Sequence, residues 1–182
     1  MKKRLFAFLA ILFTATCVQA SMIWVAVAVD PAQIEELSKN EKLLATTLFE
    51  TTGDNDNELY LDKAWHIIHF LLNGTAWEVN SVAGQAVIGG KEFGPDMGYG
   101  PAHLLTAKQV KEIAEALETI TPEHLSAKYD PKAMEKAEIY PSNIWLRDGQ
   151  EALEYLLNYY QPLRLFYQRA AKNGQAVIIV IT

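Results

Sequence analysis

The sequence predicts one compact domain of the α+β or α/β class, with a small sheet that includes strands from both ends of the mature chain. Residues 22–29 and 176–181 are apolar runs rich in Val and Ile, which is typical of buried strands. The chain between them carries helix caps and apolar periodicity, which predict mainly helices. We therefore expect the terminal strands to pair in one sheet covered by several helices.

The first 20 residues are typical of an export signal. Three basic residues precede an apolar run over residues 5–13, and Val18-Gln19-Ala20 provides the small-residue pattern for cleavage. We therefore expect a cleavable signal peptide over residues 1–20, a mature domain over residues 21–182, and a periplasmic or secreted protein. The apolar run is far shorter than the roughly 20 residues of a membrane-spanning helix. No later stretch replaces it, so we expect no membrane span.

Cys17 is the one cysteine of the chain, and cleavage after Ala20 would leave the mature protein without a thiol. Such a protein has no disulfide, cysteine nucleophile or thiolate metal ligand. An alternative is a lipoprotein anchored through Cys17. The preceding Thr14-Ala15-Thr16 lacks the large aliphatic residue that usually stands three places before a lipidated cysteine, which disfavours this alternative.

Helix signals dominate the first half of the mature chain. Asp30-Pro31 predicts a cap followed by a short helix to about residue 39. The apolar stretch 43–49 does not distinguish helix from strand. Asp62 is expected to cap a helix to about Asn73, with Gly74 as its stop, and the many apolar residues of this helix predict that it is largely buried.

The second half contains more helix starts and a glycine-rich segment. Residues 84–100 hold six of the ten glycines, so we expect this to be the longest irregular segment. A helix is expected over about residues 148–160, and Pro162 either kinks it or divides it from the next segment. Three other helices are predicted to begin with a capping box at Thr106 to Gln109 and with cap-then-proline pairs at Thr121-Pro122 and Asp130-Pro131.

Acidic residues are concentrated near the start of the domain. The export signal holds three of the 16 basic residues and none of the 22 acidic ones, so residues 21–182 carry a net charge of −9. Nine acidic and two basic residues lie between Asp30 and Asp62. This balance argues against a nucleic-acid partner. The segment is either a solvated face or a landing surface for a basic protein, with these candidate binding residues: Glu35, Glu36, Asp54, Asp56 and Glu58.

Motifs for enzymatic or metal chemistry are missing from the sequence. His66 and His69 have a spacing that could place two imidazoles on one metal, but no cysteine or H-E-x-x-H pattern supplies further ligands. A neutral core histidine is favoured for His69. The mature serines lie outside any G-x-S-x-G pattern, and Gly98-Tyr99-Gly100-Pro101 is not a phosphate loop. We expect no metal, no cofactor and no catalytic residue.

Aromatic residues near loops and helix ends suggest a second type of site. We expect Trp65 and Tyr140 to pack in the core, whereas Trp77, Tyr99 and Trp145 suit a core or a binding patch equally well. A small-molecule pocket, or the site of an unrecognised hydrolase, is the alternative to a protein-binding surface, and its candidate residues are Trp65, His69, Tyr99 and Tyr140.

Several ordered motifs carry a family resemblance: Asp62-Lys63-Ala64-Trp65, the stretch from His69 to Thr75, Ile88-Gly89-Gly90, Tyr99-Gly100-Pro101-Ala102 and Glu138-Ile139-Tyr140-Pro141. With the closing strand, these motifs resemble the YfbM-like family of small bacterial proteins over essentially the whole mature chain. The resemblance implies a compact domain of mixed helix and sheet with a label of unknown function. It implies no established catalytic residue.

Together these features favour a binding scaffold over an enzyme. The hypothesis is an exported, non-enzymatic protein-binding module, such as an immunity-type or inhibitor protein that neutralises a toxin or hydrolase in the periplasm. The expected partner is a basic protein, because the mature chain is strongly acidic.

Overall fold

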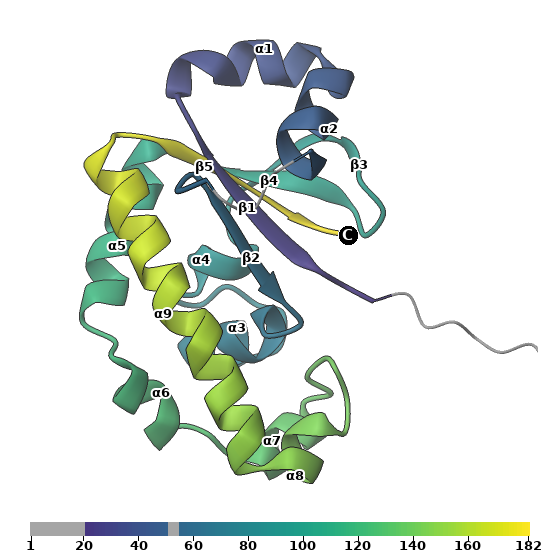
Figure 1. Ribbon diagram of the computed structural model, residues 1–182, viewed down its shortest axis with the longest axis vertical. Coiled ribbons are helices and arrows are strands. Elements are labelled where there is room, and N and C mark those ends of the chain that lie inside the picture. Colours follow the sequence, from purple (N-terminus) through teal and green to yellow (C-terminus); the bar gives the residue numbers. More distant parts are fainter. Residues whose placement is uncertain (1–20, 51–54) are drawn as a thin grey trace, which may run out of the picture.

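The computed structural model describes residues 21–50 and 55–182, so the expected signal peptide, with Cys17, and Asp54 lie outside the described residues. Within the described part, five strands form one antiparallel sheet in the order β2-β1-β5-β4-β3 (Figure 1). The terminal strands lie side by side, with Trp24 opposite Ile181 and Val29 opposite Ala176. The expected α+β class and the pairing of the end strands are confirmed. The strands are β1 (Trp24–Val29), β2 (Glu58–Asp62), β3 (Lys91–Asp96), β4 (Pro101–Leu105) and β5 (Ala176–Ile181).

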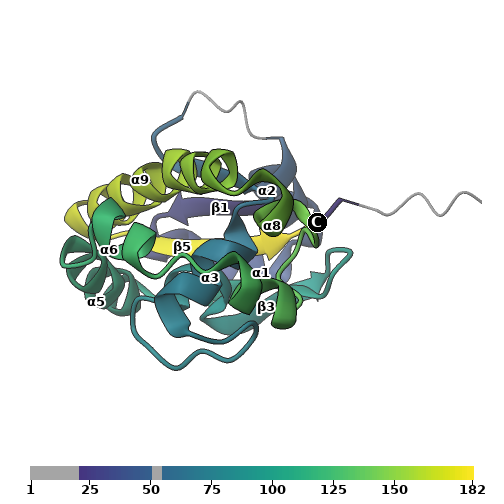
Figure 2. The same cartoon turned by 90° about the horizontal axis from the view of Figure 1, so that it is seen from below.

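Each face of the sheet buries a hydrophobic core. Side chains alternate along β1, so Trp24 and Ala26 face one core while Val25 and Val27 face the other. The second, smaller core is covered by α1 (Ile34–Lys39) and α2 (Glu41–Phe49). Figure 1 shows these two helices on one side of the sheet, and Figure 2 shows the helices grouped around the strands. The larger core lies under α3 (Trp65–Asn73), α5 (Ala107–Glu118) and α9 (Gln150–Lys172).

Four of the described helices begin at the predicted capping residues. Asp30 Oδ1 accepts a hydrogen bond from the Ala32 amide at 2.8 Å and opens a 3₁₀ turn that leads into α1. Thr106 and Gln109 form the predicted capping box of α5. Gly74 ends α3 with φ of 77°, a left-handed conformation that suits glycine. The remaining predicted starts give 3₁₀ helix η1 (Pro31–Gln33) and helices α6 (Pro122–Ala127) and α7 (Pro131–Lys136).

The predicted role of Asp62 is wrong. Asp62 is the last residue of β2 and has φ of 46°, and α3 begins after it with Ala64 at the N-cap and no side-chain cap. The sequence does carry a strand signal here, because Leu59 and Leu61 alternate with less buried residues, but the run is only five residues long and lies beside a loop. Pairing with β1, which the local sequence does not encode, decides its structure.

The expectation of irregular structure over residues 84–100 is also wrong. This segment contains α4 (Gln85–Ile88) and β3, and β3 forms a hairpin with β4. One of its glycines allows close packing: a Cβ on Gly94 would lie 2.5 Å from Leu44 Cδ2 of α2. Glycine in this strand therefore marks the approach of a helix and not the absence of structure.

Helix α9 runs through Pro162 without a break. Proline removes one backbone hydrogen bond, but the buried side chains keep helical spacing on both sides of it, as in Tyr160, Leu163 and Tyr167. Packing of this continuous stripe against α5 and the sheet outweighs the lost bond. The short helix α8 (Ile144–Asp148), which precedes α9, was not predicted.

Candidate functional site

Helix α3 holds two fully buried histidines that bind two neighbouring segments. The Nε2–H of His66 donates to the carbonyl of Ala76 at 2.9 Å, and its Nδ1 accepts from the Tyr140 amide at 2.9 Å. The His66 ring stacks on Trp65 with centroids 4.7 Å apart. His66 therefore joins α3 to the loop after it and to the segment before α8.

His69 lies one turn later and holds the same loop. Its Nε2–H donates to the Glu78 carbonyl at 3.2 Å, and its Nδ1 accepts from Asn73 Nδ2 at 3.0 Å. The Asn73 Oδ1 in turn accepts from the amides of Asn80 and Ser81 at 3.1 and 3.0 Å. A chain of hydrogen bonds thus runs from the core to the loop.

Both histidines are neutral at physiological pH. Burial lowers the pKa of His66 from 6.5 to about 4, against the opposing effect of its bond to the Ala76 carbonyl, and burial also lowers the pKa of His69. If either histidine bound a second proton at Nδ1, the new N–H would point at the N–H group that now donates to this nitrogen, and the hydrogen bond would be lost. Because both ring nitrogens are bonded in each case, these side chains serve structure, as expected for His69, and are poorly suited to proton transfer.

The loop that the histidines hold presents apolar side chains to solvent. We call residues 75–83 the pinned loop. Trp77 is 58% exposed, and Val79 and Val82 are 41% and 44% exposed. The Trp77 ring packs against His66 with centroids 4.4 Å apart, so it has a fixed position although most of its surface is open. A fixed, exposed tryptophan is typical of the centre of a protein-binding surface, and the exposed Val79 and Val82 lie on the same loop.

The contact between Asn73 and Gly84 fixes the end of this loop. Replacing Gly84 by alanine should lower the free energy of unfolding by about 1–3 kcal/mol, the usual cost of overpacking, as urea denaturation can measure. A Cβ there would lie 1.8 Å from Asn73 Nδ2, whereas the backbone φ of −68° suits alanine. The control repeats the substitution in an Asn73→Ala background, where Gly84→Ala should lower the free energy of unfolding by less. Equal costs in both backgrounds would show that this contact does not hold the loop.

The four candidate pocket residues do not line a common cavity. Trp65 and Tyr140 pack together with centroids 6.2 Å apart, and the Tyr140 hydroxyl accepts from the Met22 amide at 3.0 Å. His69 is engaged with the pinned loop. Tyr99 lines a separate cavity of about 60 Å³ with Ile88, Pro101, His103 and Ile179.

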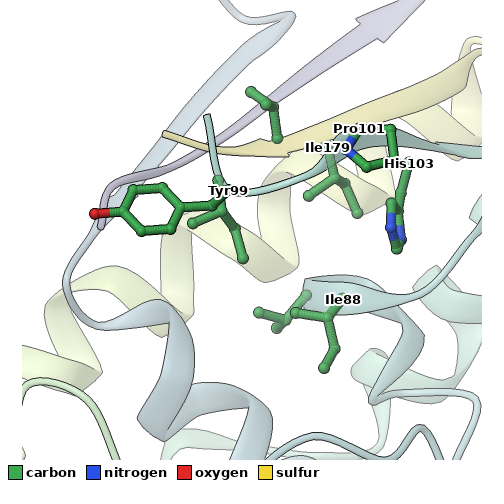
Figure 3. Close-up of a pocket in the computed structure, with 8 residues that line it drawn as sticks. Ile88, Tyr99, Pro101, His103 and Ile179 are labelled. Carbon is green, nitrogen blue, oxygen red and sulfur yellow. The ribbon is translucent and has the colours of Figure 1, made fainter. Parts of the chain in front are cut away.

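That separate cavity is too small for an organic ligand. Its 60 Å³ compares with the roughly 300–1,000 Å³ of typical ligand sites. Figure 3 shows the Tyr99 phenol directed away from His103. The His103 Nδ1–H donates to the Gly89 carbonyl at 3.3 Å, so this nitrogen is already bonded within the protein.

The aromatic residues left open by the sequence divide between core and surface. Trp145 is fully buried, whereas Trp77 and Tyr99 are 58% and 48% exposed. Trp65 is fully buried as predicted, and Tyr140 is half-buried against the core. Sequence analysis did not find Asn73 or Gly84, although the Asn73-Gly74 helix end marked the start of the loop.

The candidate acidic residues lie on two elements. Glu35 and Glu36 are exposed on α1, where Glu35 pairs with Lys39. Asp56 and Glu58 lie at the start of β2 and line a groove with Arg169 of α9. The distance from Asp56 Oδ1 to Arg169 Nε is 3.7 Å. Exposed ion pairs of this kind contribute little to the stability of a fold. Because these carboxylates lie at the surface, their charge contributes to the electrostatic field that an approaching partner experiences.

Across residues 21–50 and 55–182, no three His, Cys, Asp or Glu side chains are grouped so that they could hold a metal ion. In the same part of the chain, no helix has the length and apolar character needed to cross a membrane.

Comparison with known proteins identifies the family. Residues 21–180 match a family described as Domain of unknown function (DUF1877). No curated protein matches the chain. The crystal structure of YfbM, a protein of unknown function from Escherichia coli, is similar with a TM-score of 0.68 and 23% identity, covering 88% of this chain and 99% of that one. This likeness shows a shared fold and confirms the YfbM-like resemblance. The chain belongs to the DUF1877 family.

Proposed function

We propose that this protein is an exported, non-enzymatic protein-binding module, an immunity-type or inhibitor protein that neutralises a basic toxin or hydrolase in the periplasm. The observation that carries the proposal is the pinned loop, where Trp77 is 58% exposed yet packs on buried His66. A contact loop that is already ordered loses little conformational entropy when a partner binds. The export signal supports the compartment.

The charge of the domain indicates the chemistry of the partner. Residues 21–182 carry a net charge of −9, and the exposed carboxylates Glu35, Glu36 and Asp56 are part of it. Such a field attracts a basic protein and accelerates encounter. The pinned loop would supply the apolar contact that keeps the partner bound, because exposed charges mainly affect association.

The alternative of a small-molecule binder or hydrolase that uses Trp65, His69, Tyr99 and Tyr140 has less support. The two nitrogens of His69 are bonded to Glu78 and Asn73, and Tyr99 lies at a different cavity. A buried histidine with both nitrogens occupied cannot reach a substrate. The protein-binding proposal instead uses the exposed side chains of the pinned loop.

Replacing Val79 by aspartate should weaken binding of the partner at least tenfold, because it places a charge at the centre of an apolar contact. Trp77→Ala should have a similar effect. The partner is first captured by cross-linking in the native envelope, and its affinity for each variant is then measured by calorimetry. Val79 is 41% exposed, so Val79→Asp should leave the fold intact.

Matched variants separate the contact from the charge. Leu146→Ala removes a side chain of α8 that is 53% exposed and should leave affinity unchanged. Neutralising Glu35, Glu36, Asp54, Asp56 and Glu58 together should slow association and reduce its salt dependence. Full affinity of Val79→Asp would contradict the proposed surface. Failure to capture any partner, while a small ligand co-purifies, would count against a protein-binding function.

A further inference from the structure

A second site lies apart from the pinned loop, in a cleft between β2, α8 and the first turns of α9. Its volume of about 410 Å³ is within the range of sites for small organic ligands. Two parts of the chain that are distant in sequence build it: residues 62–63 and residues 141–155. We call it the α8–α9 cleft.

The backbone around the cleft is locally strained. Among the described residues, Asp62, Glu138 and Asn143 are the ones other than glycine with positive φ, at 46°, 54° and 71°. Asp62 lines the cleft, and the other two enclose Pro141, which also lines it. Such conformations are energetically unfavourable and cluster at functional sites. The unfavourable backbone conformation of Asp62, which itself lines the cleft, supports a role for the cleft in binding.

One carboxylate of the cleft is held in a fixed orientation. The hydroxyl of Tyr155 donates to Asp62 Oδ2 at 2.9 Å, and the ring of Tyr159 packs edge-on against Tyr155 at 5.0 Å. Burial, together with the bond to Asp62, raises the pKa of Tyr155, so the phenol stays protonated as a donor. Asp62 therefore presents a preset negative group.

The cleft also contains the guanidinium of Arg147, which is bonded to a neighbouring carboxylate. Arg147 Nη2 donates to Asp148 Oδ2 at 2.7 Å, and the bond from Arg147 keeps the pKa of Asp148 below its usual range. This pair is internally neutral. The remaining charged residues of the cleft are Asp62 and Glu151 on the negative side and Lys63 on the positive side, and Arg147 retains N–H groups beyond those that bind Asp148.

Apolar groups complete the cleft. Pro141, Ile144 and Ala152 line it between the charged residues, and Ala152 is only 4% exposed. A ligand that fits this arrangement carries a positive group, a negative group and an aliphatic part within a few bonds. A purely cationic ligand would face Lys63, and a purely anionic ligand would face Asp62 and Glu151.

We propose that the α8–α9 cleft binds a small zwitterion of the α-amino-acid type. Its ammonium group is bound by Asp62 and Glu151, its carboxylate by Lys63 and Arg147, and its aliphatic side chain lies against Ile144. The site shares no residue with the pinned loop, so it stands or falls independently of protein binding.

The test uses L-leucine as the probe and the full mature protein in calorimetry and thermal unfolding. L-leucine should bind saturably and raise the melting temperature. L-leucinamide, which lacks the carboxylate, and N-acetyl-L-leucine, which lacks the ammonium, should each bind at least about tenfold more weakly because a charged group of the cleft is left unpaired. These ligand comparisons need no protein variant.

Protein variants then test whether the ligand binds at the α8–α9 cleft. Asp62→Asn should weaken L-leucine binding at least about tenfold, since asparagine accepts the Tyr155 hydrogen bond and tolerates positive φ but carries no charge. Glu151→Gln, on the exposed first turn of α9, should weaken binding with no effect on folding. Glu36→Gln on α1 is the control and should bind normally. No saturable binding of L-leucine, or equal binding of L-leucinamide, would overturn the proposal.

Discussion

Replacing Trp65 by alanine should lower the free energy of unfolding by about 3–5 kcal/mol, the usual cost of deleting a buried large aromatic side chain. Trp65 is fully buried, stacks on His66 at 4.7 Å, and its indole N–H donates to the Met22 carbonyl at 3.4 Å. The variant therefore loses core packing and the link between α3 and the start of the domain. Chemical denaturation monitored by circular dichroism measures the loss.

Trp77 provides the matched comparison for Trp65. The two indoles are neighbours, with centroids 6.0 Å apart, but Trp77 is 58% exposed. Trp77→Ala should therefore cost clearly less stability than Trp65→Ala, and its main effect should be on binding. If Trp65→Ala changes the free energy of unfolding by no more than about 0.5 kcal/mol, as surface substitutions do, the described packing of α3 is incorrect.

Acidification should destabilise the protein before its carboxylates titrate. The pKa of His66 is about 4 in the folded protein against 6.5 in the unfolded chain, so the unfolded state binds more protons between these values. Stability is therefore full above about pH 6.5 and falls as the pH drops toward 4. His66 alone should account for about 2 kcal/mol between pH 7 and 5 and about 3 kcal/mol by pH 4.

His69 adds to the same trend, because burial lowers its pKa as well. Urea denaturation at several pH values between 7 and 5 measures the slope. His66→Gln should be less stable at pH 7 and should lose most of the slope, whereas His124→Gln, which changes an exposed residue of α6, should keep it. A wild-type stability that stays constant from pH 7 to 5 would falsify the assignment of a neutral, doubly bonded His66.

Local sequence patterns predicted the parts of the fold that depend on neighbouring residues. The strand runs 22–29 and 176–181 are apolar on both faces because β1 and β5 lie between two cores. Caps at Asp30, Thr106 and Thr121 were found because a capping residue bonds to amides two or three positions away. Each of these signals is formed by residues that lie within a few positions of one another in the sequence.

The missed elements depend on partners far along the chain. Strand β2 exists through its pairing with β1, and Gly94 lies in a hairpin strand packed against α2. At the candidate site, the sequence indicated a buried α3 but not that His66 would meet both Ala76 and Tyr140. Nor could it show that Asp62, Arg147 and Tyr155 line one cleft.

The sequence by itself determined a mixed helix-and-sheet domain, the central strand pair, the buried face of α3 and the acidic character of the domain, because periodicity, capping and charge are properties of the chain. The antiparallel pairing of the strands then decided between the α+β and α/β classes. Tertiary structure decided which aromatic residues are exposed, since Trp145 is buried while Trp77 is open. It also decided that the histidines hold a loop instead of a ligand. These outcomes follow from contacts between segments brought together only on folding, and such contacts leave no local pattern.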